Sequence, residues 1–404
     1  MNFLAKRTLK IQESATLKIM AQANIMRKNG EDIVILAAGE PDFDTPDYIK
    51  QGAIDAINKG YTKYTASIGI IELRNAISNK FKLENNLDYN ANQIIVSNGG
   101  KQAIYNTLQA IINDGDEVII PAPYWVSYPD MVLLADGVPV IVNCPLDVNF
   151  KLTPSMLEKA ITDKTKAIIL NSPNNPTGMM YSKDELIQIS EVLRRYPNIF
   201  IISDDLYEHI IFNDNKFVNI ANVAPDLLER IIIVNGVSKV YAMTGWRIGY
   251  AASQNETLIK TINIIQSQST SNPCSISQYA ALTALNAGTS HIMGMIKEFE
   301  IRHQYVLDRL KNIPDIKYLS ANGAFYAFFD CSIIIQKLYN AKKINTPHDV
   351  AFSEYLLNNY KVAGVPGSAF GMDNHLRISF ATNLEEIKKG LDRIENAISS
   401  TFAT

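Results

Sequence analysis

The sequence predicts an α/β protein whose main sheet consists of buried, mostly parallel strands. Short runs at 94–97, 199–202 and 231–234, apolar except for Ser97, indicate strands that are covered on both faces. Stretches with helical spacing of apolar residues alternate with these runs, as in repeated strand–helix units. From residue 291 the alternation gives way to a long helix and two isolated strands, which indicates a smaller α+β region.

The composition is that of an ordinary soluble globular protein in a reducing compartment. The 404 residues are 47% hydrophobic and 20% charged, and the length allows two or three domains. A net charge of −3 argues against a nucleic-acid-binding surface. Cys144, Cys274 and Cys331 are odd in number and widely spaced, so neither a disulfide framework nor a metal site is expected. We therefore expect a cytoplasmic protein.

Neither a targeting signal nor a membrane span is expected. Residues 1–16 lack the apolar core of a signal peptide, and no 18 successive residues are apolar. The chain before Gly39 is also too short for a DNA-binding domain, which disfavours a non-enzymatic regulator.

Apolar periodicity and breaker residues define the elements in chain order. We expect strands at 33–38, 94–97, 117–120, 138–143, 167–170, 199–202, 231–234, 323–329 and 376–380. We expect helices at 14–29, 46–59, 153–161, 182–195, 255–269, 273–286, 291–311, 349–360 and 383–399. Thr45 is the expected N-cap of the helix at 46–59. Ser182 and Glu185 form a capping box for the helix at 182–195.

A candidate anion site follows the strand at 94–97. There the chain runs through Asn98-Gly-Gly-Lys101 directly into a helix. Free backbone N–H groups and the helix dipole converge at such a terminus. We assign the site to the backbone amides of Gly99, Gly100 and Lys101, with the Lys101 side chain facing a substrate entrance.

Polar and aromatic side chains stand where other strands end, the edge at which α/β sheets bind ligands. Asp204 follows the strand at 199–202, with Asp205 as its competitor for the same role. Asn175 lies in the proline-rich segment 171–178, whose stiff backbone suits the presentation of one amide. Trp125 could stack on a planar ring or belong to the core.

Lys239 and Arg377 are the two cations in the most unusual settings. Lys239 comes shortly after the buried strand at 231–234, where desolvation would make its amine a nucleophile; the alternative is an exposed loop lysine. Arg377 lies inside an apolar strand and therefore needs a partner, either a substrate carboxylate or an Asp or Glu of the chain.

The segment Ser238-Lys-Val-Tyr-Ala-Met-Thr-Gly-Trp-Arg-Ile-Gly-Tyr250 resembles the cofactor-lysine segment of class I aminotransferases, which depend on pyridoxal phosphate (PLP) and have fold type I. Within that class the chain is most similar to bacterial aspartate aminotransferases. The resemblance implies a large domain, 46–290, with a mainly parallel seven-stranded sheet flanked by helices. It also implies a small α+β domain made of 291–404 and the N-terminal segment 1–45.

The resemblance further implies the roles of individual residues. Lys239 would carry PLP as a Schiff base and then act as the general base. Cofactor contacts are implied for Gly99, Gly100, Lys101, Trp125 on the ring face, Asn175, Asp204 at the ring nitrogen, Tyr207, Ser238, and Arg247 at the phosphate. Tyr64 would reach the cofactor phosphate of the partner in a homodimer. Substrate contacts are implied for Gly39, Trp125, Asn175 and Arg377. Gly236 departs from the class, because some members have a phosphate-binding serine there.

The implied activity is reversible amino transfer between L-aspartate and 2-oxoglutarate, which yields oxaloacetate and L-glutamate. Other amino donors or acceptors, including prephenate, aromatic amino acids and alanine, and a PLP-dependent β-lyase stay open as alternatives. Some relatives that use prephenate have a lysine near position 12, where this chain has Gln12, and this difference disfavours prephenate.

Overall fold

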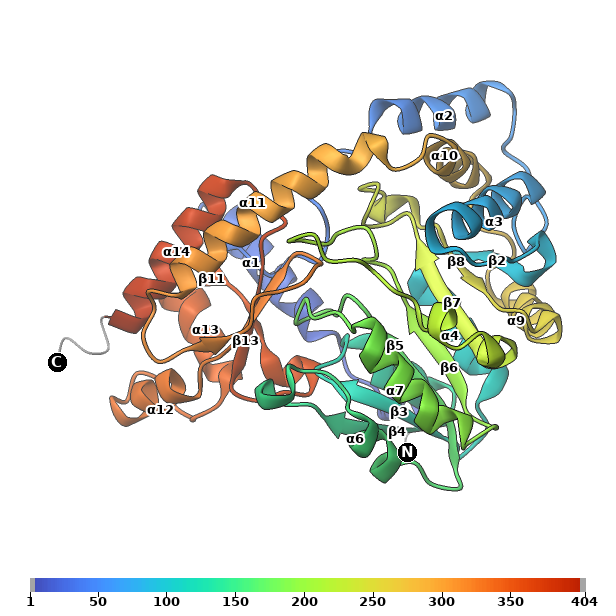
Figure 1. Ribbon diagram of the computed structural model, residues 1–404. Coiled ribbons are helices and arrows are strands. Elements are labelled where there is room, and N and C mark those ends of the chain that lie inside the picture. Colours follow the sequence, from blue (N-terminus) through green and yellow to red (C-terminus); the bar gives the residue numbers. More distant parts are fainter. Residues whose placement is uncertain (1–3, 400–404) are drawn as a thin grey trace.

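The computed structural model describes residues 4–399, and these form a large part and a smaller part (Figure 1). The large part is built on a seven-stranded sheet. Its strands, in spatial order, are β2 (Ile94–Ser97), β8 (Gly249–Ala252), β7 (Ile231–Gly236), β6 (Phe200–Asp204), β5 (Thr165–Asn171), β3 (Glu117–Ala122) and β4 (Val138–Asn143). Only β8 runs against its neighbours β2 and β7, and the other pairs are parallel. The expected mainly parallel seven-stranded sheet is thereby confirmed.

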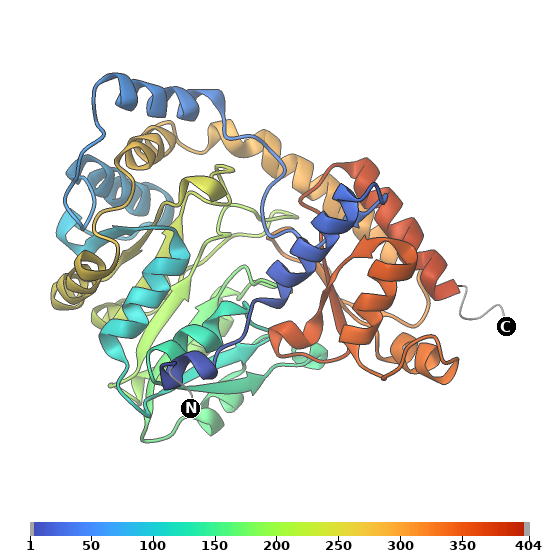
Figure 2. The same ribbon diagram turned by 180° about the vertical axis from the view of Figure 1, so that it is seen from behind.

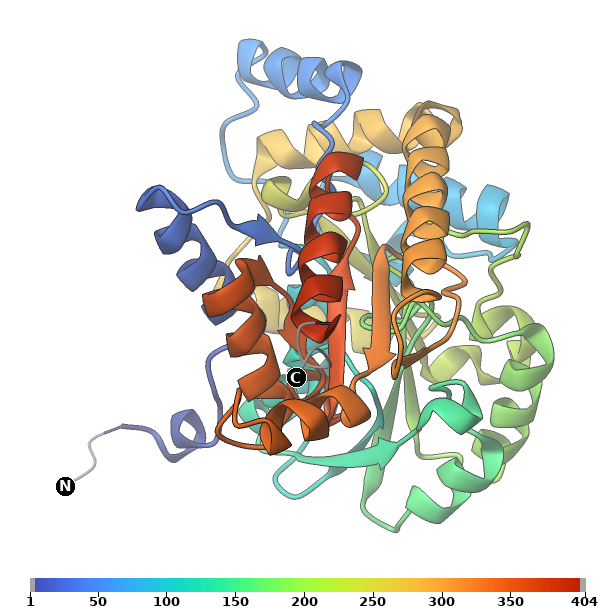
Figure 3. The same ribbon diagram turned by 90° about the vertical axis from the view of Figure 1, so that its left-hand side faces the viewer.

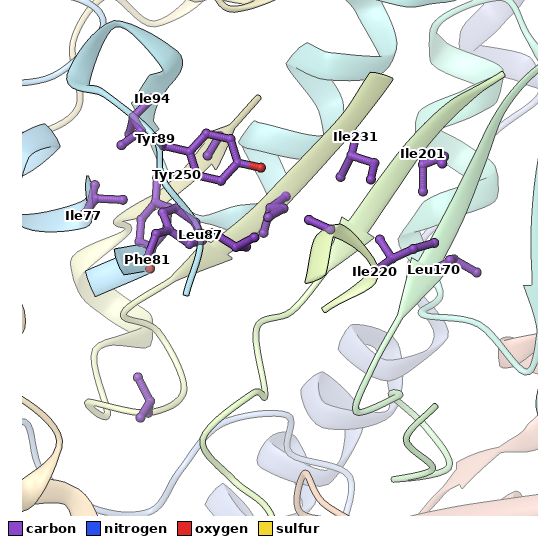
Figure 4. Close-up of a cluster of buried hydrophobic side chains, with 14 of the residues drawn as sticks. Ile77, Phe81, Leu87, Tyr89, Ile94, Leu170, Ile201, Ile220, Ile231 and Tyr250 are labelled. Carbon is purple, nitrogen blue, oxygen red and sulfur yellow. The ribbon is translucent and has the colours of Figure 1, made fainter. Parts of the chain in front are cut away.

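Helices cover both faces of this sheet, and each face has its own apolar core. They are α2 (Asp47–Asn58), α3 (Ile71–Asn85), α4 (Gly100–Ile111), α5 (Ser127–Leu134), α6 (Pro154–Ala160), α7 (Lys183–Arg194), α8 (Ile220–Val223), α9 (Glu256–Ser269) and α10 (Ser275–Asn286). Ile231 and Ile201 pack toward the face covered by α3, α7 and α10 (Figure 4). Their strand neighbours Ile232 and Ile202 pack toward α4, α5 and α9. Alternating side chains thus bury both faces, which explains the unbroken apolar runs.

The smaller part is a four-stranded antiparallel sheet with helices beside it. Its strands, in spatial order, are β12 (Val365–Pro366), β13 (His375–Ser379), β10 (Tyr326–Asp330) and β9 (Lys317–Tyr318). Its helices are α11 (Met293–Leu310), α12 (Ser332–Asn340), α13 (Asp349–Tyr360) and α14 (Leu384–Ser399). The long helix α11 connects the two parts and lies beside α14 (Figure 3).

The N-terminal segment contacts both parts (Figure 2). Its strand β1 (Val34–Ile35) pairs with β11 (Val362–Ala363), and its helix α1 (Ala15–Lys28) contacts β11 and β12 of the smaller part. The short 3-10 helix at Lys6–Leu9 instead lies against α5 of the large part. The contacts of β1 and α1 agree with placing the N-terminal segment in the small domain, whereas the contact of Lys6–Leu9 with α5 does not. The domain division at 45/46 and 290/291 stays a proposal; residues 1–3 and 400–404 lie outside the described part of the chain.

Most expected elements are confirmed, but one expected cap is wrong. Ser182 and Glu185 form the capping box of α7 as expected. Thr45 does not cap α2: its hydroxyl donates to the carbonyl of Ala242 and accepts from the indole N–H of Trp246. A tertiary contact therefore takes the hydroxyl away from the helix. Among residues 4–399, no helix has both the length and the apolarity required to cross a membrane.

Candidate active site

A cavity of about 490 Å³ gathers most of the predicted site residues. It opens where β5, β6 and β7 end, as expected for ligand sites of α/β sheets. Among the residues that line it are Gly39, Gly100, Lys101, Trp125, Asn175, Asp204, Tyr207, Ser238, Lys239, Arg247 and Arg377.

Lys239 presents its amine to this cavity. The loop after β7 is held by the buried side chains of Val237 and Val240 on either side of the lysine. Lys239 Nζ donates a hydrogen bond to the carbonyl of Gly39 at 2.6 Å. Burial lowers the pKa of Lys239 to about 8, with a smaller contribution from Arg247. The neutral, nucleophilic amine is therefore more populated near neutral pH than it would be for an exposed lysine.

The N-terminus of α4 and Arg247 form an anion cradle. Gly99 precedes α4 with a φ of +83°, and a Cβ there would lie 2.4 Å from Arg247 Nη2. A Cβ at Gly249 would lie 2.2 Å from the amide nitrogen of Gly100, so only glycine fits there. Gly236 pairs with Gly249 across β7 and β8, and its Cβ would meet the Cα of Gly249 at 2.9 Å. A serine at 236 would not fit in this packing.

Asp204, and not Asp205, faces the cavity. Asp204 Oδ2 accepts a hydrogen bond from the hydroxyl of Tyr128 at 2.5 Å, and Oδ1 accepts from the amide of Leu206 at 3.3 Å. Burial raises the pKa of Asp204 to about 6, although the bond from Tyr128 acts in the opposite direction. Asp205 accepts instead from the hydroxyl of Ser203 and from the amide of Asn219.

Aromatic side chains form another wall of the cavity. Lys101 Nζ lies 5.0 Å from the ring centroid of Trp125. Burial, together with nearby Arg247, lowers the pKa of Lys101. The hydroxyls of Tyr207 and Tyr326 are 2.9 Å apart. Trp125 is partly exposed at the cavity, so the alternative that it is simply a core residue is not supported.

Arg377 is a buried cation that finds no anionic partner among residues 4–399. Arg377 is 2% exposed, and the central carbon of its guanidinium lies 4.5 Å from the ring centroid of Tyr326. Nη1 donates to Asn175 Oδ1 at 2.9 Å and Nη2 donates to the carbonyl of Ala37 at 2.8 Å. Within residues 4–399, no Asp or Glu lies at ion-pair distance and Nε has no hydrogen-bond partner. The alternative of a carboxylate partner from the described chain is therefore excluded, and a ligand carboxylate fits.

Tyr64 is not part of this cavity. Its side chain is 91% exposed on the loop between α2 and α3. Its expected role toward a second subunit stays a prediction. Sequence reasoning in turn gave no role to Tyr128, which lies three residues after Trp125, or to Tyr326, which lies within the strand expected at 323–329.

The cavity fits a phosphorylated aromatic aldehyde. The helix terminus with Arg247 offers donors for a phosphate, Lys239 offers the amine, and the buried carboxylate of Asp204 can pair with a ring N–H. The volume is within the range of about 300–1,000 Å³ that is usual for cofactor and ligand sites.

The chain belongs to the aminotransferase class I and II family, whose family model matches residues 31–394. This is a family of transferases that use pyridoxal phosphate and act on amino and oxo acids. The chain is 52% identical over 401 residues to a Rickettsia felis protein named "Probable aspartate/prephenate aminotransferase", covering 99% of this chain and 97% of the relative. It is 48% identical over 396 residues to the "Aspartate/prephenate aminotransferase" of Nitrosomonas europaea, with coverage of 98% and 100%.

Solved aspartate aminotransferases have the same fold. The enzyme from Rhizobium meliloti superimposes with a TM-score of 0.93 at 44% identity, covering 99% of both chains. The enzyme from Thermus thermophilus, solved with maleate, gives a TM-score of 0.91 at 39% identity, covering 98% of this chain and 100% of the other. Fold type I, expected from the sequence, is confirmed.

Proposed function

We propose that this PLP-dependent aminotransferase transfers the amino group of L-aspartate to 2-oxoglutarate, reversibly, to give oxaloacetate and L-glutamate. The observation that carries the proposal is the excess of cations in the cavity. Arg377 lacks an acidic partner within the described residues, and Lys101 is a second cation at the cavity, where its exposed side chain lies beside Trp125. With Arg247 assigned to a phosphate, Arg377 and Lys101 are available for the two carboxylates of a dicarboxylic substrate.

The printed names of the relatives support the same substrate class. Relatives at 48–52% identity are named for aspartate and prephenate. The Thermus thermophilus enzyme was solved with maleate, a four-carbon dicarboxylate. Prephenate also has two carboxylates and stays the second candidate, because its ring would need apolar surface and α1 places Leu17 and Met20 at the cavity.

Each residue of the site has a task that its geometry supports. Asn175 and Arg377 hold the α-carboxylate, and this orients the Cα–H bond of the substrate. The free amine of Lys239 takes the proton from Cα, for which a pKa of about 8 is well matched. Asp204 holds a proton on the ring nitrogen of the cofactor. Pyridoxal phosphate, when bound, supplies the electron sink that makes the Cα proton acidic.

We further propose that the enzyme is a homodimer. Tyr64, Ile71 and Ile264 are large hydrophobic side chains that are exposed in the single chain. A second subunit would bury such side chains, and it would give Tyr64 the phosphate partner that its own subunit does not offer. The molar mass in solution, measured by light scattering, tests this proposal: a monomer at micromolar concentration would contradict it.

A substrate panel on the holoenzyme tests the proposed activity. Single-turnover absorbance changes should be fast with L-aspartate and L-glutamate and slow with L-alanine. Lys101→Met should raise KM for L-aspartate about tenfold, since it removes one charge-assisted hydrogen bond, and should leave KM for L-alanine unchanged. Lys166→Met is the matched control, because Lys166 lies on β5 beside Phe200 and does not line the cavity.

Two results would contradict the proposal. An absent absorbance change with L-aspartate would refute the substrate. Release of pyruvate and ammonia without amino transfer would instead identify a β-lyase.

A further inference from the structure

Tyr128 contacts the one carboxylate of the site that is assigned to the cofactor ring. It lies in the first turn of α5, which together with α4 and α9 covers one face of the large sheet. Its hydroxyl donates to Asp204 Oδ2 at 2.5 Å, and the two residues are 2% and 5% exposed. Its ring packs edge-on against Trp125, with ring centroids 5.3 Å apart. The hydroxyl is thus held in a fixed direction by packing.

Within residues 4–399, this is the shorter of the two hydrogen bonds that the Asp204 carboxylate accepts. The other described donor, the amide of Leu206, lies at 3.3 Å, and no Lys, Arg or His is at ion-pair distance. The titratable and charged groups that face the carboxylate are Tyr128 from α5, Lys239 from the loop after β7, and Asp205 and Tyr207 from its own turn. A buried carboxylate with so little neutralising charge depends on its donor to stay ionised.

We propose that Tyr128 is a positioning residue that keeps the Asp204 carboxylate ionised and fixes its orientation, so that it can pair with the protonated ring nitrogen of the cofactor. The inference rests on the proposed function, because it requires pyridoxal phosphate in the cavity. Tyr128 acts through Asp204 and does not itself touch the reacting atoms.

The test measures cofactor affinity, not only turnover. The apo forms of the wild type and of Tyr128→Phe are titrated with pyridoxal phosphate between pH 5 and pH 9. Without the hydroxyl, Asp204 should hold its proton more tightly, so the pH below which affinity falls should move up by about one unit. The affinity at pH 6 should then drop about fivefold relative to the wild type, because the ionised fraction of Asp204 falls from about one half to about one tenth. In turnover, kcat should fall while KM for the amino acid stays within about twofold.

Tyr181→Phe is the matched control. Tyr181 is also a buried tyrosine, and its hydroxyl accepts a hydrogen bond from the amide of Leu152 at 3.0 Å, outside the cavity. Its substitution should lower the thermal unfolding midpoint about as much as Tyr128→Phe does, without moving the pH profile. An equal shift in both variants would show a merely structural role and overturn the inference.

A second cofactor form separates this inference from the function on which it rests. In the 1-deaza analogue of pyridoxal phosphate a C–H replaces the ring nitrogen, so Asp204 has no ring proton to hold. Wild type and Tyr128→Phe should bind this analogue equally, and the effect of Tyr128→Phe should also vanish in the Asp204→Asn background. A loss of affinity at pH 6 that persists with the analogue would overturn the inference while amino transfer by the wild type stands. A wild type that binds neither form would refute the proposed function and the inference together.

Discussion

Arg377→Lys is the most informative substitution, because it keeps the charge and removes only the planar fork. The guanidinium uses Nη1 for Asn175 and Nη2 for the carbonyl of Ala37, and both groups are buried. A lysine ammonium is a single point donor on a flexible stem, so it cannot hold these partners and a carboxylate in one plane. The substrate carboxylate should lose one of two charge-assisted hydrogen bonds.

The expected magnitude follows from that lost bond. A hydrogen bond to a charged group contributes about 1.5–3 kcal/mol, which corresponds to a fall of about 10- to 150-fold in kcat/KM for L-aspartate. Single-turnover absorbance changes of the holoenzyme measure this ratio directly. Affinity for pyridoxal phosphate should be unchanged, since Arg377 is assigned to the substrate and not to the cofactor.

Two comparisons make the prediction refutable. Arg309→Lys is the matched control, because Arg309 pairs with Asp392 and Glu395 away from the cavity and should change kcat/KM less than about twofold. An amine substrate without a carboxylate should react equally slowly with the wild type and with Arg377→Lys. A loss below threefold with L-aspartate, or an equal loss with such an amine, would show that Arg377 does not hold the carboxylate.

Three further predictions concern the cofactor. Lys239→Ala should abolish the borohydride-dependent attachment of pyridoxal phosphate, detected by mass spectrometry, and slow amino transfer at least about 10²- to 10⁴-fold. Because burial lowers the pKa of Lys239 to about 8, the rate at which the apoenzyme captures the cofactor should rise with pH around a midpoint near 8. Below this midpoint the amine is protonated and unreactive, and above it the amine is neutral. A midpoint near 10.5 in stopped-flow measurements would contradict this prediction. Gly99→Ala should push against Arg247 and weaken pyridoxal phosphate binding about tenfold or more, but not pyridoxal binding, in fluorescence titrations. Gly60→Ala, at a similar φ of +75° with open space around it, controls for backbone strain alone.

The sequence predicts those elements of the fold that depend on local pattern. The strands at β2 and β4 have the expected bounds, because their apolar runs end sharply at polar or turn residues. Sequence reasoning did not predict β8, whose four residues Gly249–Ala252 offer neither alternation nor β-branched side chains. It also overlooked α5, whose apolar residues Met131 and Val132 share a short segment with Pro129. Such elements form because neighbouring strands and helices are already there to pack against.

For the active site, the sequence does not predict contacts between distant parts of the chain. Residue type and strand context identify Lys239, Asp204 and Arg377. Nothing in the local sequence shows that Tyr128 reaches Asp204, because the two are 76 positions apart. The pairing of Tyr207 with Tyr326 spans 119 positions and joins the large part to the smaller part. Positioning groups of this kind become visible only when the tertiary structure is known.

The segment from Gly39 to Thr45 connects with the lysine loop at several points. Lys239 Nζ donates to the carbonyl of Gly39, the Thr244 hydroxyl donates to Glu40, and the Thr45 hydroxyl donates to Ala242. Each bond joins residues about 200 positions apart, the kind of non-local contact that forms slowly during folding. The lowered pKa of Lys239 therefore depends on burial in a pocket to which a segment far away in the chain contributes.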